Sequence, residues 1–162
     1  MDLHTLLTLS IVLGVAAAPF IFVYFHHKRK QREFRKELAD LPGQIHPHFS
    51  HFEIWRSTYA IGIEKHSDSL CYINRNKNEK SCISLSEIES CRVFSGSKGT
   101  QGRNVTGGAV TRLDMVISFI DKTIPEKYLE LFDSVEYITV DGEIELAEKW
   151  RSYINSAIKK HK

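Results

Sequence analysis

The chain has 162 residues, with 22 Lys and Arg against 20 Asp and Glu and a formal net charge of +2. This length permits one domain, or one domain with an appendage, and leaves no room for several large domains. The three cysteines, Cys71, Cys82 and Cys91, are too few, and odd in number, for a disulfide-rich secreted scaffold. We expect three reduced thiols in a reducing compartment, and one disulfide with one free thiol is the alternative.

Residues 3–25 form an apolar segment, LHTLLTLSIVLGVAAAPFIFVYF, that carries no formal charge. About 21 helical residues at ~1.5 Å per residue cover roughly 30 Å, the thickness of the hydrocarbon core of a bilayer. Backbone amides in that layer must be satisfied within the segment, so we expect a transmembrane helix, kinked at Pro19. Ala16-Ala17-Ala18 leaves a cleaved signal peptide as an alternative, although the start lacks Lys and Arg and the apolar run continues past it. A buried core helix is the third alternative, but few small domains bury a helix on all sides.

A strongly basic flank follows the apolar segment. Lys28 to Lys36 include six Lys or Arg and one acid, Glu33. Because basic flanks stay on the cytoplasmic side, we expect a single-pass inner-membrane protein with its N-terminus outside and everything from His26 onward in the cytoplasm. An outward-facing domain is the alternative if this orientation is reversed. The residues expected at the membrane interface are Tyr24, Phe25, Lys28, Arg29, Lys30 and Arg32.

Residues 26–51 are expected to join the membrane segment to the domain as a basic helical stalk followed by a linker containing His and Pro. Phe34, Leu38 and Leu41 recur at helical spacing, and Pro42-Gly43 would end the helix. A histidine group raises a metal-binding alternative and consists of His46, His48, His51 and His66. Its spacing matches no zinc-binding pattern, so no metal or other cofactor is expected.

Residues 52–162 are expected to form a cytoplasmic domain of short strands that ends in a helix. Apolar alternation and turn residues predict strands at 59–64, 70–74, 81–85, 88–95, 109–120 and 127–132. Apolar residues from Ile144 to Ile158 recur every three or four positions, which predicts an amphipathic helix after Asp141-Gly142. The order favours an α+β, mainly β domain: an antiparallel sandwich or open barrel of six to seven strands whose open end the helix covers.

A glycine-rich stretch at residues 96–108 holds five of the nine glycines. It lacks the GK[ST] ending of a P-loop and the strand-then-helix setting of a GxGxxG fingerprint, so a flexible hairpin connection is expected. Its two cations, Lys98 and Arg103, are the residues predicted to contact a partner or lipid headgroups.

Five stretches carry a resemblance to a known family: AIGIEKHSDSLCYI, ISLSEIESCRVF, GGAVTRLDMVISFID, YLELFD and ELAEKWRSYINSAI. In this order, over roughly residues 52–160, they resemble bacterial single-pass membrane proteins with a pleckstrin-homology-like (PH-like) domain. The resemblance implies a PH-like antiparallel fold capped by a C-terminal helix. It implies no activity, and it transfers no functional residue to this chain.

The sequence contains no recognisable pairing of a nucleophile with a base. Asp114 and Asp121 are expected to be solvated surface acids. We therefore expect a non-catalytic, membrane-anchored binding or scaffold module that serves a membrane complex. Its partners would be the bilayer and another protein, not nucleic acid. The alternative is a membrane-bound, metal-dependent hydrolase that uses His46, His48, His51 and His66.

Overall fold

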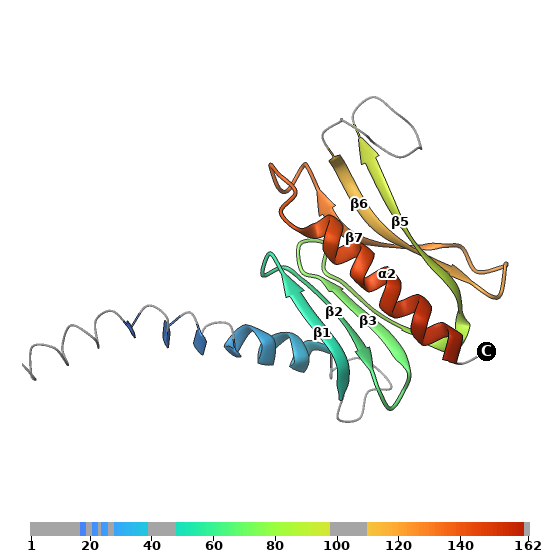
Figure 1. Cartoon of the computed structure of the whole chain (residues 1–162), viewed down its shortest axis with the longest axis horizontal. Coiled ribbons are helices and arrows are strands. Elements are labelled where there is room, and N and C mark those ends of the chain that lie inside the picture. Colours follow the sequence, from blue (N-terminus) through green and yellow to red (C-terminus); the bar gives the residue numbers. More distant parts are fainter. Residues whose placement is uncertain are drawn as a thin grey trace, which may run out of the picture.

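The structure is a computed structural model that describes residues 17–18, 21–22, 24–25, 28–38, 48–97 and 110–160. Within these residues, seven strands form two antiparallel sheets and a long helix follows them (Figure 1). The elements are β1 (Phe49–Trp55), β2 (Tyr59–Glu64), β3 (Ser69–Asn74), β4 (Glu79–Ser84), the 3-10 turn η1 (Leu85–Glu87), β5 (Ile88–Ser97), β6 (Val110–Phe119), β7 (Lys127–Asp133) and α2 (Glu143–Lys160). The predicted mainly β class with a C-terminal helix is confirmed.

The two sheets follow chain order, with β1-β2-β3-β4 in the first and β5-β6-β7 in the second. Tight turns join the strands of the first sheet, and four residues in them have positive φ: Arg56, Ser57, Asp68 and Asn78. Asp and Asn tolerate this conformation better than most residues, which explains their place at two of the turns. The short η1 turn then carries the chain from the first sheet into the second.

The main core lies between the inner faces of the two sheets and α2. From α2 it receives Ala147, Trp150, Ile154 and Ile158, which recur every three or four positions as the sequence predicts. Asn155 fastens α2 to β5, because its amide donates to the Cys91 carbonyl at 2.8 Å and accepts from the Cys91 N–H at 3.0 Å. The edge of β5 is thereby covered by the helix at this point.

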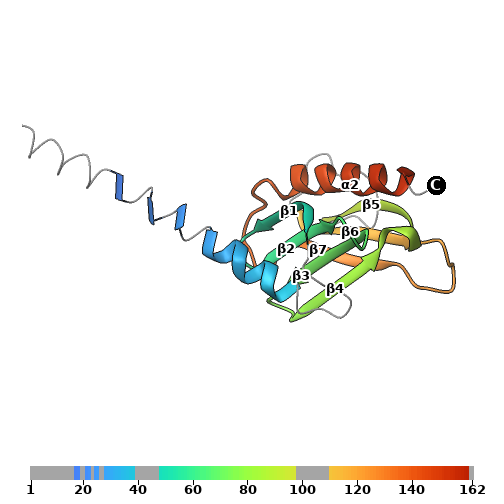
Figure 2. The ribbon, with the colours of Figure 1, turned by 90° about the horizontal axis from the view of Figure 1, so that it is seen from below.

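A second helix, at residues 28–38, packs against the first sheet and is called the docked helix below (Figure 2). Phe34 and Leu38 are fully buried, in a cluster that includes Ala60, Cys71 and Ile73 on the face of the sheet opposite the main core. Polar contacts reinforce the packing. Glu37 lies 2.5 Å from the Arg75 guanidinium and 3.4 Å from the Lys80 ammonium. The segment predicted as a stalk is thus part of the domain's packing.

Burial of both faces explains the composition of β2 and β3, whose residues are all buried. Gly62 fits this arrangement, because a Cβ at that position would lie 2.7 Å from the ring of Phe49. The first sheet therefore forms the middle layer of the domain, between the docked helix and the main core.

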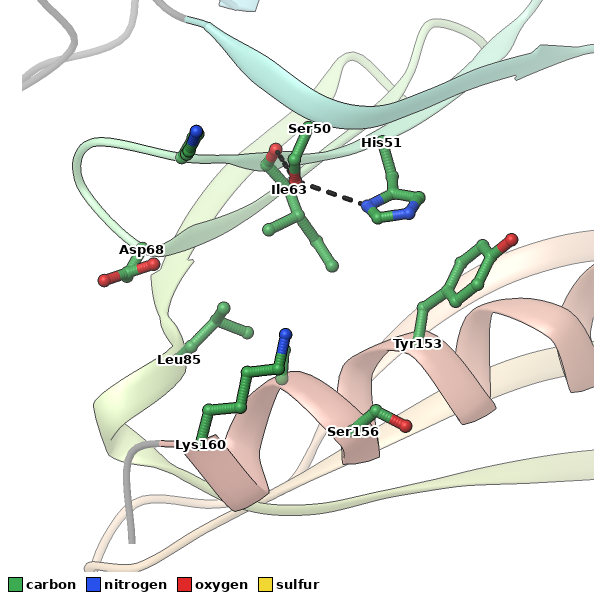
Figure 3. Close-up of a pocket in the computed structure, with 10 residues that line it drawn as sticks. Ser50, His51, Ile63, Asp68, Leu85, Tyr153, Ser156 and Lys160 are labelled. Atoms are coloured by element: carbon green, nitrogen blue, oxygen red, sulfur yellow. Dashed lines mark hydrogen bonds between the residues drawn. The ribbon is translucent and has the colours of Figure 1, made fainter.

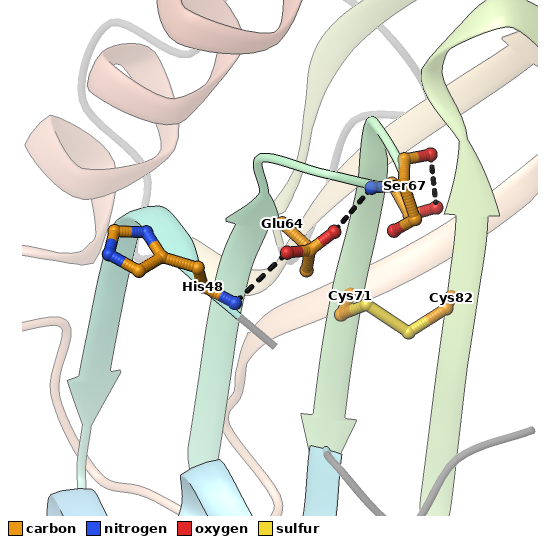
Figure 4. Close-up of a disulfide and its surroundings, with 6 residues drawn as sticks. His48, Glu64, Ser67, Cys71 and Cys82 are labelled. Atoms are coloured by element: carbon orange, nitrogen blue, oxygen red, sulfur yellow. Dashed lines mark hydrogen bonds between the residues drawn. A yellow bond between two sulfur atoms is a disulfide. The ribbon is translucent and has the colours of Figure 1, made fainter. Parts of the chain in front are cut away.

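A disulfide joins Cys71 on β3 to Cys82 on β4 beneath the docked helix (Figure 4). The two residues are directly opposite in the antiparallel register, with their Cα atoms 4.1 Å apart. The expectation of three free thiols is therefore wrong, and the alternative of one disulfide with one free thiol describes the structure. The free thiol is Cys91, and burial raises its pKa to about 12.

Candidate functional site

A pocket of about 370 Å³ opens between the first sheet and the C-terminal half of α2 (Figure 3). The first sheet and η1 contribute Ser50, His51, Ile63, Lys65, Asp68 and Leu85, and α2 contributes Tyr153, Ser156, Ala157 and Lys160. The helical residues share one side of α2 because they are spaced three or four apart. Apolar side chains and cationic or hydroxyl groups thus meet in one cavity, a composition typical of binding sites.

The start of β1 is shaped by an irregularity that places two pocket residues. The register with β2 shifts between Phe49 and His51, so Ser50 is the extra residue. The Ser50 hydroxyl donates to the Ile63 carbonyl at 3.2 Å. The His51 ring faces Tyr153 with 4.5 Å between ring centroids, which closes one side of the pocket against α2. A bulge of this kind also makes an edge strand a poor template for adding another strand.

Buried Glu64 fixes the turn that forms the pocket rim (Figure 4). Its carboxylate accepts from the backbone N–H of His48 at 2.9 Å and from that of Ser67. Burial alone would raise the pKa of Glu64, but the backbone donors, Ser67 and His48 foremost, outweigh it and lower the pKa to about 2. Because the carboxylate stays ionised, the 65–68 turn holds its shape and keeps Lys65 and Asp68 at the rim.

Two lysines give the pocket a cationic side. Among the described residues, neither Lys65 nor Lys160 lies within ion-pair distance of a carboxylate, whereas Lys149 on the same helix is paired with Glu53 at 2.7 Å. The floor between them is apolar and includes Ile63, Leu85 and Ala157. This arrangement suits a ligand that presents an aliphatic group beside a carboxylate.

Ser50 and His51 are close enough to suggest a nucleophile and its base, since the His51 Nδ1 atom lies 3.3 Å from the Ser50 hydroxyl oxygen. The Ser50 hydroxyl also lies 3.2 Å from the Ile63 carbonyl, and the His51 tautomer decides which of the two groups receives its proton. While the hydroxyl donates to the Ile63 carbonyl, the imidazole N–H donates to the Ser50 oxygen, and Ser50 is not activated by this base.

The predicted interface residues lie along the docked helix and the helical residues before it. Tyr24 and Phe25 are exposed, and the Lys28 ammonium lies 4.6 Å from the centroid of the Tyr24 ring. Arg29 pairs with Glu33 at 3.2 Å, and Arg32 is exposed. Lys30 donates to the Ser57 hydroxyl at 2.6 Å, a contact with the β1–β2 turn that the sequence did not predict. The other predicted contacts, Lys98 and Arg103, lie outside the described residues.

The histidine group is only partly described, because His46 lies outside the described residues. The rings of His48 and His66 meet edge to face with 6.1 Å between their centroids. His51 lies against Tyr153 instead. Within the described part of the chain, no three His, Cys, Asp or Glu residues are arranged to hold a metal ion.

A buried polar network joins the two sheets at the end of the domain that holds the β3–β4 turn. Glu130 accepts from the Tyr59 hydroxyl and the Asn74 amide, each at 3.2 Å, and also pairs with Lys77. Directly across the β6–β7 ladder lies Asp114, which pairs with Arg112 at 2.6 Å. The expectation of a solvated Asp114 is wrong: the residue is 1% exposed, and its Oδ1 atom has no hydrogen-bond partner among the described residues. Consecutive residues of β6 and β7 are buried around Asp114 and Glu130, so both faces of the second sheet are covered here. The alternation of apolar residues along a single strand does not reveal the second buried face.

Comparison of the chain with protein-family models, curated proteins and solved structures gives no match. Within the described residues, no helix combines the length and the apolarity needed to cross a bilayer.

Proposed function

We propose that the chain is a membrane-anchored, non-catalytic binding module that serves a membrane complex. Residues 3–25 would anchor it as a single transmembrane helix, and the pocket beside α2 would receive a segment of a partner protein. Two antiparallel sheets closed by a C-terminal helix support a PH-like fold for the domain. The PH-like fold and the anchor are both part of the proposal.

Several features of the described residues support the anchor. Ile21, Phe22 and Phe25 are all more than half exposed, as lipid-facing side chains would be. The described helical residues 17–18, 21–22 and 24–25 lie beyond the first turn of the docked helix (Figures 1 and 2). Because the docked helix is packed into the domain, the membrane segment would hold the domain in a defined orientation.

The observation that carries the proposal is that the pocket and the contact of the docked helix lie at opposite ends of β1. Lys30 contacts Ser57, just beyond the end of β1, whereas Ser50 and His51 line the pocket near its start. A seven-residue strand rises about 3.3 Å per residue, which separates these ends by roughly 20 Å. The pocket would then open away from the bilayer, where a partner can reach it. Tethering raises the effective concentration of the domain near other membrane proteins, so even a weak contact becomes useful.

Two observations favour opposite sides of the membrane for the domain. The six cations between Lys28 and Lys36 favour a cytoplasmic domain. The Cys71–Cys82 disulfide favours an oxidising compartment. We propose the cytoplasmic side, where the disulfide would be reversible, because the flank acts directly on membrane insertion. A reporter enzyme fused after Lys162 that is active only outside the cytoplasm would reverse this orientation.

The binding proposal is tested by photocrosslinking in intact cells. A photoreactive residue at position 156 lies in the pocket, and one at Lys159 on another side of α2 serves as a control. We expect a discrete crosslinked membrane-fraction protein from position 156 only. The crosslink should be lost in Lys160→Glu and kept in the matched variant Lys159→Glu. Equal crosslinking from both positions, or no effect of Lys160→Glu, would contradict the pocket's role.

A further inference from the structure

The loop between β7 and α2 presents two almost fully exposed apolar side chains. Val135 is 90% exposed and Ile138 is 98% exposed. The loop is held in shape by hydrogen bonds. Asp133 accepts from the Val135 N–H at 2.9 Å through its side chain and from the Tyr137 N–H at 3.0 Å through its carbonyl. Both apolar side chains are therefore held on a turn whose conformation is fixed by hydrogen bonds.

Three of the acidic residues around this loop are directed toward partners in the domain, whereas Asp141 and Glu145 are exposed. Glu136 accepts from the Tyr59 hydroxyl at 2.9 Å and from the Asn76 amide. Glu143 pairs with Arg56, and Asp133 lies 3.9 Å from the Lys77 ammonium. Compensation of these charges lowers the electrostatic cost of bringing the loop close to an anionic surface.

The loop is tied to the same end of the domain that the docked helix contacts. Tyr137 donates its hydroxyl to the Thr58 side chain at 3.1 Å, and Arg56 donates to the Thr139 carbonyl at 2.6 Å. Both partners belong to the β1–β2 turn, whose Ser57 accepts from Lys30. Figure 1 shows this loop and the first turn of the docked helix on the same side of the domain.

The length of chain between the proposed anchor and the domain limits how far this end can lie from a bilayer. Phe25 closes the apolar segment and precedes Lys30 by five residues, a span that would be about 7.5 Å in a continuous helix. An anchored chain would therefore hold the β7–α2 loop within the reach of the interfacial layer. Apolar side chains at such a position gain free energy by entering the headgroup boundary.

We infer that Val135 and Ile138 enter the interfacial region of the same bilayer that holds the anchor, as a second membrane contact. This inference rests on the proposed anchor. A second point of contact would reinforce the tilt that the packed docked helix gives the domain. The pocket beside α2 would then be presented at a set angle away from the membrane.

The test uses the full-length chain reconstituted in vesicles of phosphatidylcholine and phosphatidylglycerol. Val135→Cys and Ile138→Cys are labelled with an environment-sensitive fluorophore and exposed to lipids that carry a nitroxide quencher near the headgroup. The matched controls are Ile120→Cys and Ile124→Cys, which are 54% and 42% exposed in the β6–β7 turn. The native cysteines leave such labelling selective, since Cys91 is buried and the other two form the disulfide.

We expect quenching at positions 135 and 138 to exceed that at 120 and 124 roughly twofold or more. Equal quenching at all four positions in a protein that floats with the vesicles would overturn this inference and leave the anchor standing. Failure of the chain to float would overturn the anchor and this contact together. Protection of positions 135 and 138 in native membranes, without quenching in vesicles, would assign the loop to a protein partner instead.

Discussion

Cys71 and Cys82 are directly opposite each other on neighbouring strands, and their disulfide lies under the docked helix. The bond connects the two strands whose shared face carries Phe34 and Leu38. The redox state of these two cysteines is therefore coupled to the surface on which the docked helix rests.

Reduction of this disulfide should weaken the domain measurably. A cross-link that closes a loop of about a dozen residues stabilises a protein by about 2–3 kcal/mol, chiefly through the unfolded chain. We expect dithiothreitol to lower the melting temperature of the wild-type protein, and Cys71→Ala/Cys82→Ala to melt at the same temperature with and without reductant. Thiol titration of the unreduced, unfolded protein should count one free thiol. Three free thiols, or a melting temperature that reductant leaves unchanged, would contradict the pairing.

Truncation of Phe34 should release the docked helix. The ring is fully buried, and the Arg75 guanidinium lies 3.6 Å from its centroid. Phe34→Ala is expected to cost about 3 kcal/mol of unfolding free energy, in the range for a large side chain removed from a core. Limited proteolysis should then cut within residues 28–38 much faster than in the wild type. Arg32→Ala, on an exposed position of the same helix, is the control and should change neither property.

The docked helix also marks a limit of prediction from the sequence. The strand at 59–64 was predicted from its apolar alternation, and its Ile61 and Ile63 both lie in the main core. The helix α2 was likewise predicted from its apolar repeat. What alternation along single strands could not show is that Ala60 and Cys71, on the opposite face, are also buried. That burial depends on a helix that precedes the domain in sequence, and only tertiary packing decides where it lies.

The disulfide and the pocket differ in how far the sequence could have predicted them. The predicted strands 70–74 and 81–85 leave residues 75–80 as their turn, a register that would place Cys71 opposite Ser84. In the structure the turn is shorter, Asn74 pairs with Glu79, and Cys71 lies opposite Cys82. The strands were therefore predicted, but the register that forms the disulfide was not. The pocket was not predicted at all, because it brings Ser50 and Lys65 of the first sheet beside Ser156 and Lys160, about a hundred residues away.

Glu64 should make the stability of the domain sensitive to acid. Its folded-state pKa is lowered to about 2 from an ordinary value of 4.5, so its contribution is present above pH 4.5 and is lost as pH falls toward 2. Glu64→Gln removes this charge, and we expect a loss on the order of 2–3 kcal/mol at pH 7. Urea unfolding at a series of pH values should show a shallower acid limb in the variant. Parallel curves for the two proteins between pH 5 and pH 2 would contradict the assignment.

Asp114 should affect the pH dependence of stability in the opposite direction to Glu64. Burial raises its pKa above the ordinary value, and the pairing with Arg112 offsets only part of that rise. A group with a raised folded-state pKa favours folding most below its unfolded pKa, and this contribution is lost as pH rises through the folded value. Asp114→Asn keeps the shape without the buried charge, so we expect its unfolding free energy at pH 7 to equal or exceed that of the wild type. The exposed acid Asp121 supplies the control: Asp121→Asn should leave the unfolding free energy within about 0.5 kcal/mol of the wild type at that pH. A marked loss of stability in Asp114→Asn at pH 7 would show instead that the carboxylate is held ionised by a partner that outweighs its desolvation.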